Sequence, residues 1–184
     1  MSHTPQFTSG NEHSADATQA FSNTYAPQAD ISLLDNVQPG LNLYLPLKNP
    51  MQMAALAQTL EDNKAATQHA LSSLHYVHFA RFLPSRDYSA LWVITVFDGA
   101  YGVANDPGPY ADSLQSYLMD FVATMGDIFT AILDFVEGAP RLPVHEYPRD
   151  FIEYVTAQNN AQVNPWSAYP QLTVIDIQTS HGLA

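Results

Sequence analysis

Strand-like patterns occur in four segments of the chain. Residues 41–47 place a leucine at every second position, which is typical of a strand with one apolar face. Residues 75–84 and 89–99 are dense in β-branched and aromatic residues, and only the short segment SRDY separates them, which predicts an antiparallel hairpin. Residues 172–178, LTVIDIQ, predict a last strand.

Between these strands, apolar residues recur every three or four positions, as they do in amphipathic helices. The first such region starts at Asn49 and Pro50, an N-cap followed by a proline at the first helical position, and Gln52 stands where a capping box would form. This region predicts two short helices or one bent helix. Residues 114–136 predict a longer helix of about seven turns, and another short helix is expected to begin near Pro148.

The order of these elements is strand, helix, strand, strand, helix, small helix, strand. It predicts an α+β fold, the ferredoxin-like βαββαβ antiparallel sheet with helices on one face, over residues 40–180. Residues 1–39 contain few large apolar side chains in their first thirty positions, and we expect them to form a mobile N-terminal arm. Residues 91–97 are apolar on both faces of their strand. The second face of the sheet therefore needs a cover, which we expect to be a second copy of the chain in a homodimer.

The composition limits both partners and chemistry. Lys and Arg total 6 against 18 Asp and Glu, so the formal charge of −12 disfavours nucleic acid and anionic membranes as partners. The absence of Cys excludes disulfides, thiolate nucleophiles and Cys-ligated zinc. The first residues lack the basic and apolar regions of a secretory signal, and we expect a cytoplasmic protein. No HExxH motif or similar spacing predicts a metal site.

Three short strings carry a resemblance to a known superfamily: VHFARF (77–82), FDG (97–99) and YPQLTVIDI (169–177). With the element order over residues 41–178, they resemble the dimeric α+β-barrel superfamily, in particular its peroxidase- and monooxygenase-related branch. The resemblance implies a barrel-like homodimer whose subunits each enclose an apolar, aromatic-lined cavity for a small hydrophobic or aromatic ligand, possible haem binding, and oxidoreductase activity. The sequence lacks the GxxDG-type distal motif of the dye-decolorising peroxidases.

Two polar residues, His78 and Arg81, lie within the aromatic segment 75–84. Strand alternation places them on opposite faces of the predicted sheet. His78 is a candidate catalytic acid or base, or else a structural histidine with satisfied hydrogen bonds. Arg81 is a candidate for stabilising an anionic group of a substrate, or else part of a structural ion pair with Asp98 or Asp176.

A tight register of the predicted hairpin would place Trp92 and Ile94 beside Ala80 and His78, as an aromatic wall with one titratable group. These positions suggest a substrate pocket near the strands. The residues that we expect to line it are Tyr44, Tyr76, Trp92, Ile94 and Asp176.

The superfamily resemblance also implies a haem ligand on a helix. The candidates are His69, within a predicted helix, and His145, which precedes the last predicted helix and has Glu146 beside it. The leading functional hypothesis is an oxidoreductase of the haem peroxidase or monooxygenase type. The alternatives are a cofactor-free cyclase or isomerase on a polyketide-like substrate, with His78 and Tyr44 or Tyr76 moving protons, and a non-catalytic binding or assembly module.

Overall fold

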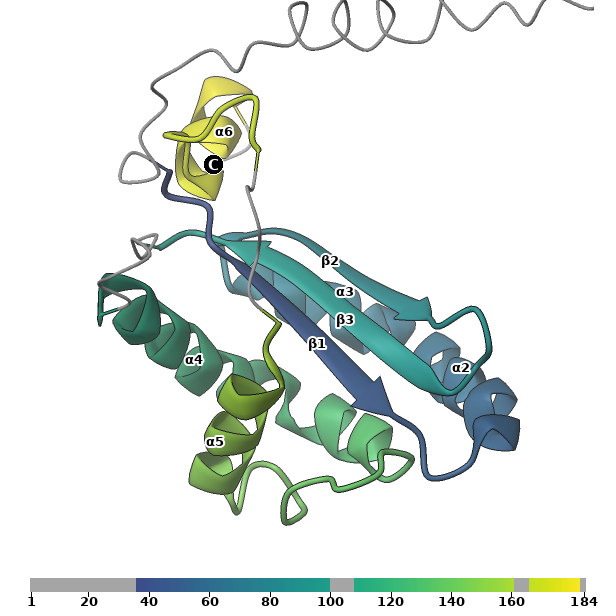
Figure 1. Ribbon diagram of the computed structural model, residues 1–184. Helices are drawn as coiled ribbons and strands as arrows, with labels where there is room; N and C mark the ends of the chain where they lie inside the picture. The colour runs from purple at the N-terminus through teal and green to yellow at the C-terminus, as the bar shows by residue number, and fades with distance from the viewer. Residues whose placement is uncertain (1–35, 100–107, 161–165, 183–184) are drawn as a thin grey trace, which may run out of the picture. The chain divides into compact units, whose positions relative to one another are not determined.

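The computed structural model describes residues 36–99, 108–160 and 166–182, which lie in one compact unit (Leu33–Ala184) with an α+β fold (Figure 1). The predicted arm, residues 1–39, lies outside the described residues apart from its last four. The elements are β1 (Gly40–Pro46), the 3-10 helix η2 (Pro50–Gln52), α2 (Met53–Asp62), α3 (Lys64–Ser73), β2 (Val77–Pro84), β3 (Ala90–Phe97), α4 (Gly108–Leu133), α5 (Pro148–Gln158) and α6 (Val174–Ser180).

The three described strands form an antiparallel sheet in the order β1-β3-β2. The first three predicted strands and the hairpin are therefore confirmed. The β2–β3 pairing is irregular between Val77 and Phe79, which leaves His78 at a bulge. A bulge interrupts the strict alternation of side chains along a strand and turns the extra residue in a new direction.

The predicted last strand is wrong, because its residues form the helix α6 (Val174–Ser180). Thr173 caps this helix: its hydroxyl accepts a hydrogen bond from the backbone N–H of Asp176, and the Asp176 carboxylate accepts one from the backbone of Thr173. This capping box favours a helical start over an extended one. The α+β class is confirmed, whereas the fourth strand of the ferredoxin-like order is not formed by the residues that the structure describes.

Helices α2, α3, α4 and α5 lie together on one side of the sheet (Figure 1). The leucines of β1 and alternate residues of β3 pack against them, as the period-two pattern predicts. Helix α4 supplies much of this core. Its stretch Ser113–Leu133 is long and apolar enough to span a membrane, but more than half of its most apolar window is buried within the domain, as in a core helix.

The first helical region confirms one of the two predicted arrangements. Asn63 separates α2 from α3, so the region forms two short helices. The Asn49 side chain caps η2 by accepting a hydrogen bond from Met51 N–H at 3.0 Å. The predicted capping box is wrong, because Gln52 Oε1 is buried without a hydrogen-bond partner.

Hydrogen bonds in the β2–β3 turn should make the Asp87 carboxyl group titrate at an unusually low pH. The Asp87 carboxylate accepts hydrogen bonds from the hydroxyls of Ser85 and Ser89 at 2.7 and 2.8 Å, which lowers the Asp87 pKa from its ordinary 3.8 to about 2. Because the folded pKa lies below the unfolded one, these bonds stabilise the turn fully above pH 3.8 and are lost as the pH falls through about 2. A carboxyl ¹³C NMR titration should give a midpoint near 2, rising toward 3.8 in Ser85→Ala. A wild-type midpoint near 3.8 would contradict this prediction.

Candidate functional site

Side chains that point away from the helices form a second face of the sheet, which we call the outer face. The strand pairing sets Tyr44 opposite Trp92, with ring centroids 4.9 Å apart in an edge-to-face arrangement, and sets Arg81 opposite Ile94. Phe79, on this face, is 41% exposed, whereas Val93, on the core side, is 1% exposed. The outer face consists of Asn42, Tyr44 and Pro46 from β1, Phe79, Arg81 and Leu83 from β2, and Trp92, Ile94 and Val96 from β3.

Arg81 is the charged residue of the outer face. Its guanidinium lies 5.2 Å from the centroid of the Phe79 ring, within cation–π range. The predicted ion pair with Asp98 or Asp176 is wrong, because Asp98 contacts His78 and Asp176 caps α6. In a chain with 18 acidic residues, this face carries one cation and no carboxylate.

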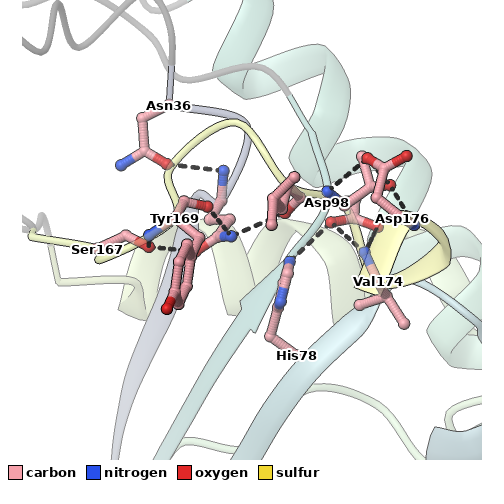
Figure 2. A network of polar contacts seen from close by, with 10 residues as sticks. Asn36, His78, Asp98, Ser167, Tyr169, Val174 and Asp176 are labelled. Carbon is pink, nitrogen blue, oxygen red and sulfur yellow. Dashed lines mark hydrogen bonds and ion pairs between the residues drawn. The ribbon is translucent and has the colours of Figure 1, made fainter. Parts of the chain in front are cut away.

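His78 contacts the carboxylate at the end of the neighbouring strand. The distance from His78 Nε2 to Asp98 Oδ1 is 2.7 Å, and the two side chains are 12% and 15% exposed. Asp98 also accepts hydrogen bonds from the backbone N–H of Val174, at 2.9 Å to Oδ2 and 3.3 Å to Oδ1 (Figure 2). One carboxylate thus joins the bulge in β2 to the start of α6.

The register differs from the predicted one around His78. Trp92 lies opposite Leu83 and Ile94 lies opposite Arg81, so the expected wall of Trp92 and Ile94 beside His78 is wrong. The connection between the strands explains the difference, since residues 85–89 separate them and the pairing begins at Pro84 with Leu91, before the bulge at His78 is reached. His78 and Arg81 accordingly belong to different places on the sheet.

His78 lines a cavity of about 260 Å³ between the end of α3, strand β2 and helix α6, which we call the His78 cavity. The imidazole Nδ1 has no hydrogen-bond partner among the described residues. It is also not one of the fully buried side-chain atoms that lack a partner there, so it keeps some exposure. His75, also on the cavity wall, has a positive φ of 53°. The lining residues are Leu71, Ser72, His75, Val77, His78, Phe79, Ala80, Val174 and Gln178.

A second cavity, of about 410 Å³, lies where Asp98 and Tyr76 meet helix α4. The Tyr76 hydroxyl donates a hydrogen bond to Asp120 at 3.0 Å, and burial together with this carboxylate raises the Tyr76 pKa well above its usual range. Burial raises the pKa of Tyr117 to about 12. Both hydroxyls therefore stay protonated near neutral pH and cannot act there as bases.

The predicted substrate pocket is divided among separate places in the structure. Tyr44, Trp92 and Ile94 lie on the outer face, whereas Tyr76 contacts helix α4 through Asp120. Asp176 is part of the cap of α6. His78 does not pair with Tyr44 or Tyr76 within the described part of the chain, where the only hydrogen bond of its ring goes to Asp98.

The two predicted haem ligands do not share a cavity. His69 is exposed on α3, and His145 lies in the loop before α5, where its Nδ1 is 3.2 Å from Asp127 Oδ1 and its side chain is 55% exposed. Neither histidine lines either of the two cavities described above. The described residues also contain no group of three or more His, Asp or Glu side chains that could hold a metal ion. Haem-dependent oxidoreductase chemistry stays a prediction.

Sequence reasoning missed the pairing of His78 with Asp98 and the role of Val174. A signal for the first was present, because an antiparallel hairpin brings the start of one strand beside the end of the next. Comparison with known proteins adds no assignment: no family model, curated protein or solved structure matches the chain.

Proposed function

We propose that this chain is a self-associating module whose outer face joins two copies into a homodimer. The observation that carries the proposal is an apolar, aromatic sheet face left outside the core. Phe79 and Leu83 of β2 are 41% and 43% exposed there, although β1 and β3 of the same sheet bury leucine and valine on the other side. Exposed apolar patches of this kind mark interaction surfaces more often than isolated apolar residues do.

The charge distribution supports a second copy as the partner. Two chains with a formal charge of −12 repel each other over most of their surfaces. The outer face has no carboxylate, so two such faces can meet without placing acidic groups against each other. Salt should strengthen the dimer, because it screens the long-range repulsion and leaves the apolar contact intact.

The size of the face sets the expected affinity. Three strands spaced about 4.8 Å apart, with a rise of about 3.3 Å per residue, cover roughly 350 Å² in projection. A standard interface buries about 800 Å² of accessible surface on each partner. The outer face therefore supplies an apolar centre that needs a rim around it, and we expect a reversible dimer rather than a permanent one.

A charge placed in the middle of the outer face should separate the two copies. Ile94 lies on the central strand β3 opposite Arg81, and Ile94→Lys would bury an ammonium group on a face that has no carboxylate to pair with it. We expect its dimer dissociation constant, measured by sedimentation equilibrium of the full chain, to rise at least about 100-fold, since an unpaired buried charge costs several kcal/mol.

Met119→Lys is the matched control, because Met119 is an exposed apolar residue of α4 outside the outer face. Circular dichroism checks that both variants are folded. A wild type that is monomeric at about 0.1 mM would overturn the proposal. So would equal association of wild type and Ile94→Lys.

A further inference from the structure

The His78–Asp98 contact leaves one imidazole nitrogen available. An ionised carboxylate can only accept hydrogen bonds, so Nε2 of a neutral His78 must carry the ring proton and donate it to Asp98. The other nitrogen, Nδ1, is then an acceptor. It has no partner among the described residues, and its ring forms part of the wall of the His78 cavity. Figure 2 shows the ring directed at Asp98 through one nitrogen, with the second nitrogen on its other side.

Several contacts hold this imidazole in place. Asp98, which fixes the ring, is itself held by the backbone N–H of Val174 at 2.9 Å. His78 also occupies the irregular step of β2, and bulges commonly re-aim a side chain next to a functional site. His75, at the same cavity, has a left-handed backbone that is costly for a residue other than glycine.

The remaining walls define what the His78 cavity can hold. Leu71, Val77 and Ala80 contribute apolar surface, while the Ser72 hydroxyl and the Gln178 amide are neutral hydrogen-bond donors. The volume of about 260 Å³ is below the range of about 300–1,000 Å³ for drug-sized ligands. A small molecule with one carbonyl oxygen and a short apolar part fits these groups.

We infer that the His78 cavity is a proton-transfer site for a small neutral carbonyl compound with an acidic C–H bond. His78 Nδ1 takes the proton from the carbon next to the carbonyl, and the electrons of that C–H bond form the C=C bond of an enolate. The enolate oxygen accepts hydrogen bonds from Gln178 or Ser72. Asp98 stabilises the imidazolium, which returns its proton to carbon, so no oxidant or cofactor is consumed. Asp98 is a positioning residue, and the inference does not depend on dimer formation.

Hydrogen–deuterium exchange tests this site without knowledge of the natural substrate. The full chain is incubated in D₂O with cyclopentanone, cyclohexanone or indan-2-one, and loss of the α-proton signal is followed by NMR. We expect exchange of at least one ketone to be about 100-fold faster than with imidazole at the same concentration. His78→Gln, whose amide can still donate to Asp98, should fall to the imidazole rate. His69→Gln, on the exposed face of α3, is the matched control and should leave the rate unchanged.

Two further variants separate a catalytic role from a structural one. Asp98→Asn should slow exchange at least about tenfold, and ¹⁵N NMR should show His78 changing from the Nε2–H tautomer to a mixture. Gln178→Leu should slow exchange and leave the His78 tautomer unchanged. If His78→Gln does not fold, this variant shows whether the His78 cavity catalyses the exchange. Exchange no faster than with imidazole for all three ketones would overturn the inference. The inference would also be overturned if His75→Gln lost the exchange activity while His78→Gln kept it. Ile94→Lys should keep the exchange rate, which distinguishes failure of this site from failure of dimer formation.

Discussion

Phe129→Ala is expected to lower the free energy of unfolding by about 3–5 kcal/mol. Phe129 is 1% exposed in the middle of the core. Its ring packs edge-to-face against Phe121, with centroids 4.8 Å apart, and against Phe151, at 5.8 Å, and it also meets Phe82 of β2 at 6.5 Å. Its removal leaves a cavity where α4, α5 and the sheet meet, and these rigid neighbouring rings can fill little of that space.

Urea unfolding, followed by far-ultraviolet circular dichroism, measures this loss. The total free energy of unfolding of a small domain is about 5–15 kcal/mol, so the variant should be close to unfolding at 25 °C. The control is Met119→Ala on the same helix, because Met119 is exposed and should change the free energy of unfolding by no more than about 0.5 kcal/mol. A loss below about 1 kcal/mol for Phe129→Ala would mean that the aromatic cluster is not packed as described.

Asp98→Ala is expected to release α6 from the rest of the domain. Its carboxylate accepts hydrogen bonds from His78 and from the N–H of Val174, and hydrogen bonds to charged groups contribute about 1.5–3 kcal/mol each. The substitution also leaves the largely buried His78 imidazole without a partner. A helix of seven residues is not stable alone in water, so α6 depends on such contacts.

Hydrogen exchange resolved by residue measures the release. Amide protection in Val174–Ser180 should fall at least about 30-fold, the equivalent of about 2 kcal/mol, while protection in β3 changes less. Asp134→Ala is the charge-matched control, since Asp134 is an exposed carboxylate in the turn after α4. The Gln38 amide also holds this segment, through the carbonyls of Tyr169 and Leu172. Unchanged protection of α6 in Asp98→Ala would show that these other contacts suffice.

Local patterns predicted most of the elements because their cause is local. Alternating leucines in residues 41–47 and the dense apolar run in 89–99 require one buried strand face each, and the short turn between β2 and β3 leaves little choice but a hairpin. The recurring apolar positions of α4 likewise need one continuous core. The N-cap at Asn49 depends on nothing beyond its own turn.

Contacts outside the hydrophobic pattern explain the parts that this pattern did not predict. The segment 172–178 has β-branched residues suited to a strand, yet the local Thr173–Asp176 capping box and the long-range bond from Val174 N–H to Asp98 favour a helix there. The expected aromatic wall beside His78 failed because the connection at residues 85–89 sets a different register between β2 and β3. Arg81 was expected to pair with an aspartate, but both aspartates are engaged elsewhere and the guanidinium lies over Phe79.

The sequence by itself determined the α+β class, the hairpin, the positions of the helices before α6 and the presence of a second apolar sheet face, because periodicity and turn length act within short segments. Only the tertiary structure decided which polar groups meet. The pairing of His78 with Asp98 and the exposure of His69 and His145 depend on register and packing between segments far apart in the chain. A shift of one residue in register reverses the direction of a side chain, and no local pattern specifies such a shift.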